Sequence, residues 1–173
     1  MRLFVKMSLT LLLFLYLAVL TKLVLFKYIP LTELRNLANF DFSEIRWRSS
    51  NFVPFETIKL FWYADNLNLN IRIENLVGNI IGFVPFGFIL PMLSDKFRKL
   101  FVVMLATFYL SLAYEGLQFL TGFGSFDVDD LILNTLGGIL GYLAYKIFLE
   151  MVKFKNKSGT KPISSFFWQY FLN

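Results

Sequence analysis

The sequence predicts an all-α membrane protein that crosses the bilayer about four times. Hydrophobic residues make up 57% of the 173 positions, and the mean hydropathy is +0.60. Soluble domains contain roughly 45–50% apolar residues. Four apolar runs each approach the roughly 20 residues that about 30 Å of hydrocarbon requires. They lie at about 7–26, 76–94, 101–121 and 129–149. We expect residues 1–173 to form a single membrane domain.

The first run resembles the core of a secretion signal, because Arg2 and Lys6 precede it. It is longer than a signal core, however, and no small-x-small cleavage site follows it. We therefore interpret it as an uncleaved anchor with no polar stripe, which predicts a peripheral helix.

Basic residues predict the orientation, because cytoplasmic loops carry an excess of lysine and arginine. They precede the first span, fill the loop between the second and third, and follow the fourth: Arg2, Lys6, Lys96, Arg98, Lys99, Lys153, Lys155, Lys157 and Lys161. The turn between the third and fourth spans holds only acids. Both termini are expected in the cytoplasm, and the net charge of +5 reflects this bias rather than a nucleic-acid surface.

The outer connection at 27–75 is expected to hold short interfacial helices. "VPFETIKLFWYADN" places Phe55, Ile58, Phe61 and Trp62 at helical spacing, which suits a helix with an aromatic face in the headgroups. "LTELRNLANF" and the terminal "SSFFWQYFLN" are similar candidates.

Several chemistries are excluded by composition. The chain has no cysteine and no histidine, so disulfides, the usual zinc sites and Ser-His-Asp triads are absent. No haem or nucleotide signature is present.

Polar and small residues form one stripe on each of the last three spans. The stripes are Asn75, Asn79, Gly82 and Phe86; Thr107, Ser111, Glu115, Gln118 and Gly122; and Asp130, Asn134, Gly137, Gly141 and Tyr145. Glu115 lies about six residues, or roughly 9 Å, inside the outer end of its span, and Asn79 and Asn134 lie at a similar depth. These stripes predict an outward-facing pocket, to which periodicity adds Asp127 and Asp130 in preference to Asp129.

Structural roles remain open as alternatives. Asp127, Asp129 and Asp130 also suit a helix N-terminus, where acids cap free N–H groups. Asn134 and Gln118 also suit interhelical hydrogen bonds. The pairs Gly78-x-x-x-Gly82 and Gly137-x-x-x-Gly141 predict close helix packing.

Glu115 favours a functional interpretation. A carboxylate inside a span costs about 2.5–3.5 kcal/mol on the insertion scale. Three states remain open: the group is protonated, it binds a cation, or it pairs with an arginine of the outer connection. The arginines in question are Arg46, Arg48 and Arg72.

Several motifs in order make the chain similar to the VanZ-like membrane proteins, over residues of about 45–150. They are "NFVPFETI" from Asn51, "NLVGNIIGFVPFGFILP" from Asn75, "EGLQ" from Glu115 and "GSFDVDDLILNTLGGILGY" from Gly124. The resemblance implies a bacterial envelope protein associated with resistance to teicoplanin, a glycopeptide antibiotic that targets cell-wall precursors outside the membrane. It also adds Asn51 to the candidate binding residues.

Two functions stay open for the predicted pocket. As an enzyme, it would use Glu115, Asp127 and Asp130 for catalysis on a lipid-linked or phosphorylated envelope substrate, with Asn79, Gln118, Asn134 and Asn51 as binding residues. Asp127 and Asp130 would be ligands if Mg²⁺ or Ca²⁺ took part. As a pure binder, it would capture a lipid headgroup, a cell-wall precursor, an amphiphilic antibiotic or another membrane protein.

Overall fold

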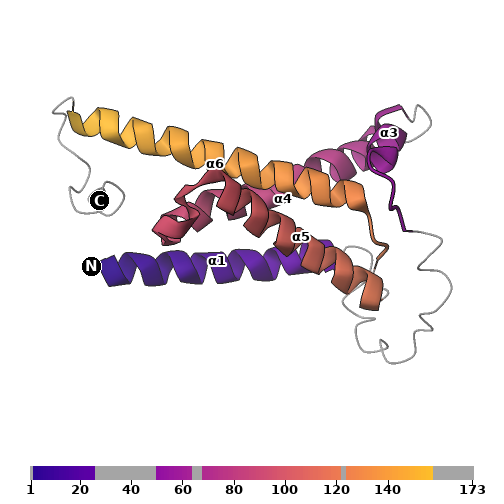
Figure 1. Ribbon diagram of the computed structural model, residues 1–173, viewed down its shortest axis with the longest axis horizontal. Helices are drawn as coiled ribbons and strands as arrows, with labels where there is room; N and C mark the ends of the chain where they lie inside the picture. The colour runs from indigo at the N-terminus through magenta and orange to yellow at the C-terminus, as the bar shows by residue number, and fades with distance from the viewer. Residues whose placement is uncertain (1, 26–49, 64–67, 122–123, 158–173) are drawn as a thin grey trace.

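The computed structural model describes residues 2–25, 50–63, 68–121 and 124–157, and these form a bundle of helices (Figure 1). The elements are α1 (Arg2–Leu25), α3 (Glu56–Tyr63), α4 (Leu69–Leu93), the 3₁₀ turn η2 (Asp95–Arg98), α5 (Leu100–Thr121) and α6 (Val128–Lys157). In the described part of the chain, α1, α4, α5 and α6 are long and apolar enough to cross a membrane. The predicted all-α class and its four spans are confirmed.

The helices run further than the apolar runs that predicted them. α4 begins at Leu69 rather than near 76, and α6 continues to Lys157 rather than ending near 149. Hydropathy marks the stretch that suits lipid, whereas backbone hydrogen bonds continue through adjoining polar residues. The helical part of the predicted interfacial segment at 55–62 is confirmed as α3. The segments "LTELRNLANF" and "SSFFWQYFLN" lie outside the described residues.

Glycines allow α4 and α6 to pack backbone against backbone. A Cβ atom on Gly137 would lie 2.1 Å from the carbonyl oxygen of Ile80, and one on Gly141 would lie 2.1 Å from that of Val84. Real Cβ atoms essentially never approach an atom so closely, so neither position accepts a side chain without moving a helix. The predicted close-packing role of this glycine pair is confirmed.

The α4 partner of this contact differs from the prediction. A Cβ on Gly78 would meet nothing within 4 Å, and one on Gly82 would make only an ordinary contact of 3.6 Å with Leu20. Gly87 takes their place, because its Cβ would lie 2.0 Å from the carbonyl oxygen of Gly138. The glycine spacing alone could not show which face of α4 meets α6.

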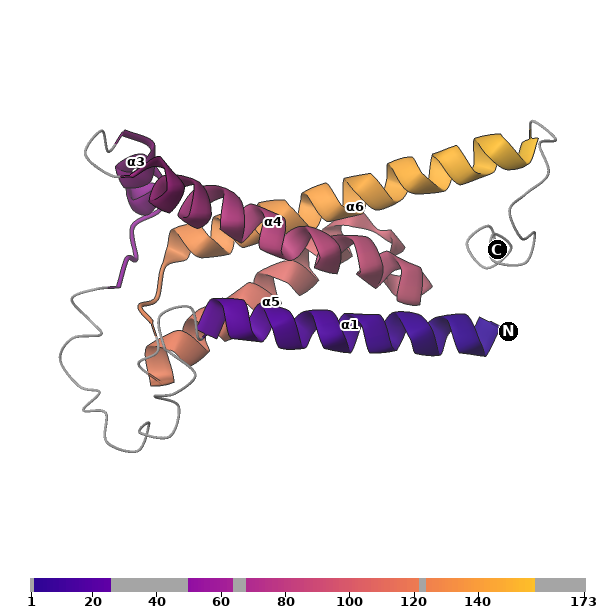
Figure 2. The same ribbon diagram turned by 180° about the vertical axis from the view of Figure 1, so that it is seen from behind.

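α1 packs along α4 and α5 and presents its other faces outward, as Figures 1 and 2 show from opposite sides. Only 6% of its span is buried. Two hydroxyl groups hold it in place: Tyr16 donates to the carbonyl of Gly82 over 2.6 Å, and Thr21 bonds to the hydroxyl of Tyr114 over 2.9 Å. α1 is therefore peripheral, as expected, but it is fixed by polar contacts that the sequence did not predict.

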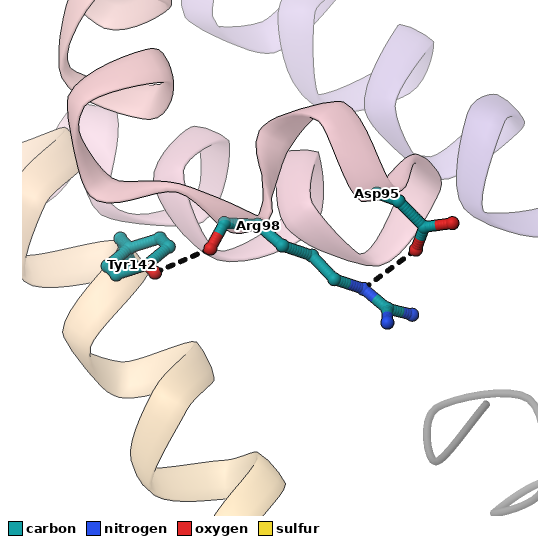
Figure 3. A network of polar contacts seen from close by, with 3 residues as sticks. All are labelled: Asp95, Arg98 and Tyr142. Atoms are coloured by element: carbon teal, nitrogen blue, oxygen red, sulfur yellow. Dashed lines mark hydrogen bonds and ion pairs between the residues drawn. The ribbon is translucent and has the colours of Figure 1, made fainter.

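The α4–α5 turn, which contains η2, closes the end of the bundle opposite α3 (Figure 1), and Figure 3 shows its polar contacts. The Tyr142 hydroxyl of α6 donates to the carbonyl of Arg98 over 2.7 Å, and the Arg98 side chain pairs with Asp95 at 2.9 Å. A buried cluster of Val103, Tyr142, Tyr145 and Leu149 lies next to this turn. The turn is thus level with the middle of α6, not with its end.

Candidate functional site

Two distant segments meet beside α3. The N–H of Asn51 donates to the carbonyl of Phe126 over 2.8 Å, and the N–H of Val128 donates to the carbonyl of Asn51 over 3.0 Å. These bonds form an isolated parallel bridge between Asn51 and Asp127. The rings of Phe52 and Phe126 stack beside it, 5.2 Å apart. The bridge fixes the start of α6 against the segment that leads into α3.

The side chain of Asn51 is fully engaged within the protein. Its Nδ2 donates to Asp127 Oδ1 and to Thr57 Oγ1, both over 3.0 Å, while its Oδ1 accepts the N–H of Val53 over 2.9 Å. These bonds hold the outer segment in place. A ligand that bound Asn51, as the resemblance implies, would have to replace one of them.

Asp127 connects this segment to α5 and α6. Its Oδ1 accepts the N–H of Asp129 over 2.8 Å, which is the N-cap arrangement for α6. Its own N–H donates to Glu115 Oε2 over 2.9 Å. A single residue therefore joins Asn51, the first turn of α6 and the buried glutamate of α5.

Glu115 is almost completely buried, with 1% of its surface exposed. Like charges on Asp130 and Asp127 lie within Coulombic range of its carboxylate. Within the described ranges Glu115 has no ion pair: Arg72 donates instead to the carbonyls of Phe61 and Trp62 at the end of α3. Arg46 and Arg48 lie outside these ranges. The described partner of Glu115 is thus a backbone N–H.

A pair of predicted site residues joins α6 to α4. Asn79 Nδ2 donates to Asp130 Oδ1 over 2.5 Å, so these two predicted site residues are in direct contact. One turn further along α6, Asn134 Nδ2 donates to Ser111 Oγ of α5 over 2.8 Å. Asn134 is 3% exposed, and its Oδ1 has no partner in the part of the chain that the structure describes. Glu115, Asp130, Asn79 and Asn134 thus lie at the junction of α4, α5 and α6.

Gln118 faces a different helix from the one that the stripe suggested. Its Nε2 donates to the carbonyl of Val24 over 3.1 Å and so ties α5 to α1. Successive positions of a stripe point in different directions around the helix axis. The step of three residues from Glu115 to Gln118 turns the Gln118 amide towards α1. Its predicted role in binding a substrate stays a prediction.

Asp129, which periodicity left outside the predicted pocket, is buried against α3. It is 0% exposed, and its two carboxylate oxygens accept the N–H groups of Phe55 over 2.5 Å and Ile58 over 3.0 Å. Asp129 thereby caps α3, a helix far from it in sequence, rather than its own helix. Phe55 has a φ of 68°, in the left-handed region that non-glycine residues rarely adopt. Periodicity along α6 could not reveal this role, because it takes no account of α3.

Metal binding gains no support from the described residues. Among them, no group of three or more aspartate, glutamate, histidine or cysteine side chains is placed to hold a metal ion. Asp127, one of the two predicted metal ligands, already accepts two hydrogen bonds at Oδ1. Glu115 and Asp130 stay candidate site residues.

Comparisons with known proteins agree with the motifs. A model of the VanZ/LLP1 family matches residues 13–149, so the match begins inside α1 and extends further than the motifs do. The protein named Protein VanZ from Enterococcus faecium is 33% identical over 136 residues, which cover 78% of this chain and 71% of that protein. No solved structure matches this chain.

Proposed function

Because the chain belongs to the VanZ/LLP1 family, we propose that it binds an amphiphilic molecule of the bacterial envelope in the outer leaflet. The binding site is the junction of Glu115, Asp130 and Asn79. The family takes its name from a protein associated with teicoplanin resistance. The envelope ligand would be a cell-wall precursor or a glycopeptide of that kind.

The distribution of charge supports the outward placement of this junction. The acids Asp127, Asp129 and Asp130 lie at the start of α6, whereas the basic α4–α5 turn lies beside Tyr142, further along that helix. The positive-inside rule assigns the basic turn to the cytoplasm. Both termini then lie in the cytoplasm.

The depth of the junction supports an amphiphilic ligand. Glu115 is 115 − 100 = 15 residues from the inner end of α5, or about 22 Å along the helix. In a hydrocarbon layer of about 30 Å, it lies roughly 8 Å below the outer surface. A ligand that reaches Glu115 therefore needs a polar group and a part that enters the lipid.

The buried carboxylate of Glu115 is the observation that carries the proposal. A single described hydrogen bond holds it, from the N–H of Asp127, and the like charge of Asp130 lies near it. Two nearby carboxylates attract a cationic or hydrogen-donating group. Ammonium, amide and hydroxyl groups of an envelope molecule meet that requirement.

Catalysis is the second candidate function, and the proximity of Glu115 and Asp130 favours it. One carboxylic acid beside one carboxylate provides a general acid and a general base for cleavage of a lipid-linked or phosphorylated substrate. A reaction would leave a new product among the envelope lipids, whereas binding alone would not. Mass spectrometry of these lipids, with and without the protein, separates the two candidates.

Two substitutions of Glu115 test the site. Glu115→Gln keeps an oxygen that can accept the Asp127 N–H but removes the charge, whereas Glu115→Leu removes both. We expect both variants to abolish the increase in teicoplanin resistance that the wild-type chain gives to a susceptible host, with the Glu115→Gln variant as abundant as the wild type. Glu150→Gln, at an exposed residue of α6, is the matched control. Full resistance with Glu115→Gln would refute a role for the carboxylate.

A further inference from the structure

α6 extends well past the α4–α5 turn. Leu149 is its last residue in the cluster beside that turn, and the helix continues for 157 − 149 = 8 residues to Lys157. At about 1.5 Å per residue, this is roughly 12 Å. Figures 1 and 2 show the end of α6 beyond the turn, and they show α6 inclined to α1. We call Lys146–Lys157, which is this part together with the four residues before it, the α6 extension.

The α6 extension has an exposed apolar stripe. Ile147, Met151 and Phe154 are 62%, 59% and 74% exposed, and their spacing of four and three residues places them on one side of the helix. The charged residues of the adjoining side are Lys146, Glu150 and Lys153, with Glu150 and Lys153 paired at 2.7 Å. The stripe begins five residues past Tyr142, the residue of α6 that contacts the α4–α5 turn.

The charge of the α6 extension indicates what covers this stripe. Its sequence contains four lysines and one glutamate, for a net charge of 4 − 1 = +3. Cationic helices with an exposed apolar side bind the headgroup layer of anionic membranes, where the apolar side chains enter the acyl region and the lysines meet phosphate. The candidate span of α6 runs from Val128 to Phe154 and has 27 residues, or about 40 Å, which is longer than the roughly 30 Å of hydrocarbon. A span of this length has its last residues in the headgroup layer.

We propose that the α6 extension is a docking surface for anionic phospholipid on the side of the membrane that contains the α4–α5 turn. Met151 and Phe154 enter the acyl boundary, and Lys146 and Lys153 contact headgroup phosphates. This surface is at the opposite end of α6 from the Glu115 junction and requires no ligand there. It anchors the bundle on a leaflet rich in anionic lipid.

Spin labels on single cysteines test this proposal, since the chain has no cysteine of its own. The full chain would carry a nitroxide at Met151→Cys or Phe154→Cys on the apolar stripe, or at Glu150→Cys on the charged side. Collision rates with oxygen, which concentrates in lipid, and with a water-soluble nickel complex report the surroundings of each label in vesicles. We expect oxygen to dominate at 151 and 154 and nickel to dominate at 150 in vesicles that contain phosphatidylglycerol.

The dependence on lipid charge completes the test. Each lysine near an anionic surface shifts its partition by about fivefold, so the contrast between stripe and charged side should weaken in neutral phosphatidylcholine vesicles. Lys146→Gln with Lys153→Gln removes two of the four lysines and should weaken the response to phosphatidylglycerol. Nickel access at all three labels would show the helix in water and overturn the proposal. Strong spin–spin coupling at 151 and 154 would show a second copy on the stripe and would also overturn it.

Discussion

Replacing Asp129 should release α3 from the bundle. In Asp129→Ala, the N–H groups of Phe55 and Ile58 lose their carboxylate partner. Hydrogen bonds to a charged group contribute about 1.5–3 kcal/mol each, which gives roughly 3–6 kcal/mol as an upper limit for two. Because Phe55 is 52% exposed, water can replace part of the lost hydrogen bonding. We therefore expect the free energy that holds α3 on the bundle to fall by about 2–3 kcal/mol. The strained backbone of Phe55 favours release further.

Hydrogen exchange measures this loss directly. A local opening that becomes easier by about 2–3 kcal/mol accelerates exchange about 30- to 150-fold, and we expect this for peptides covering residues 50–63 in nanodiscs. Peptides from α5 should exchange as in the wild type. Asp95→Asn is the matched control, because this aspartate makes an ion pair with 82% of its side chain exposed and should leave 50–63 unchanged. Unaltered exchange of 50–63 in Asp129→Ala would refute the capping role.

Two further substitutions test the packing of the bundle. Gly137→Ala places a Cβ 2.1 Å from a backbone oxygen of α4 and should destabilise the protein by about 1–3 kcal/mol or more, seen as a lower melting temperature. The control Gly116→Ala meets nothing within 4 Å and should melt at the wild-type temperature or slightly above it, because alanine favours a helix over glycine. A Gly137→Ala variant that melts like the Gly116→Ala control would contradict the close contact. Tyr142→Phe removes the hydrogen bond to the α4–α5 turn and should lower the free energy of unfolding by about 1 kcal/mol. The control Tyr109→Phe changes a residue that is 63% exposed and should leave the free energy of unfolding unchanged. An equal decrease in both variants would show that the Tyr142 hydrogen bond does not stabilise the fold.

The sequence predicted the parts of the fold that depend on a chain's own periodicity. Apolar runs of the right length identify α1, α4, α5 and α6, and the aromatic spacing at 55–62 identifies α3. The stripe containing Glu115 and the one containing Asp130 do face the same junction, because a polar side chain inside a span has few other places to lie. The ends of the helices were less predictable, since a helix does not stop where its apolar run stops.

The sequence could not predict which helix a polar residue meets. Gln118 shares a stripe with Glu115, yet its amide bonds to α1. Asp129 looked like a cap for its own helix, but its partners are N–H groups more than 70 positions away. Both contacts depend on the packing of distant segments, and hydropathy and spacing contain no information about such pairs. The bridge between Asn51 and Asp127 was unpredictable for the same reason.

The free-energy gain from a structural role of Glu115 can be compared with the cost of placing its carboxylate inside a span. Its carboxylate accepts the N–H of Asp127 at the start of α6, and an anion at a helix N-terminus contributes about 0.3–1 kcal/mol, or about 2 kcal/mol when partly buried. Placing a carboxylate inside a span costs about 2.5–3.5 kcal/mol. The structural gain is smaller than the cost of a charge at the centre of a span, so we expect an ionised Glu115 to lower the stability of the fold.

The thermal stability of Glu115→Gln therefore distinguishes the two roles. The glutamine oxygen can still accept the Asp127 N–H, while the buried charge and its repulsion with Asp130 are removed. We expect a melting temperature equal to or higher than that of the wild type, together with the loss of the proposed function, which is the pattern of a residue retained for activity at a cost in stability. Glu115→Asp keeps the charge but shortens the side chain, and it should melt lower than Glu115→Gln. A melting temperature for Glu115→Gln several degrees below the wild type would show that the carboxylate serves the fold.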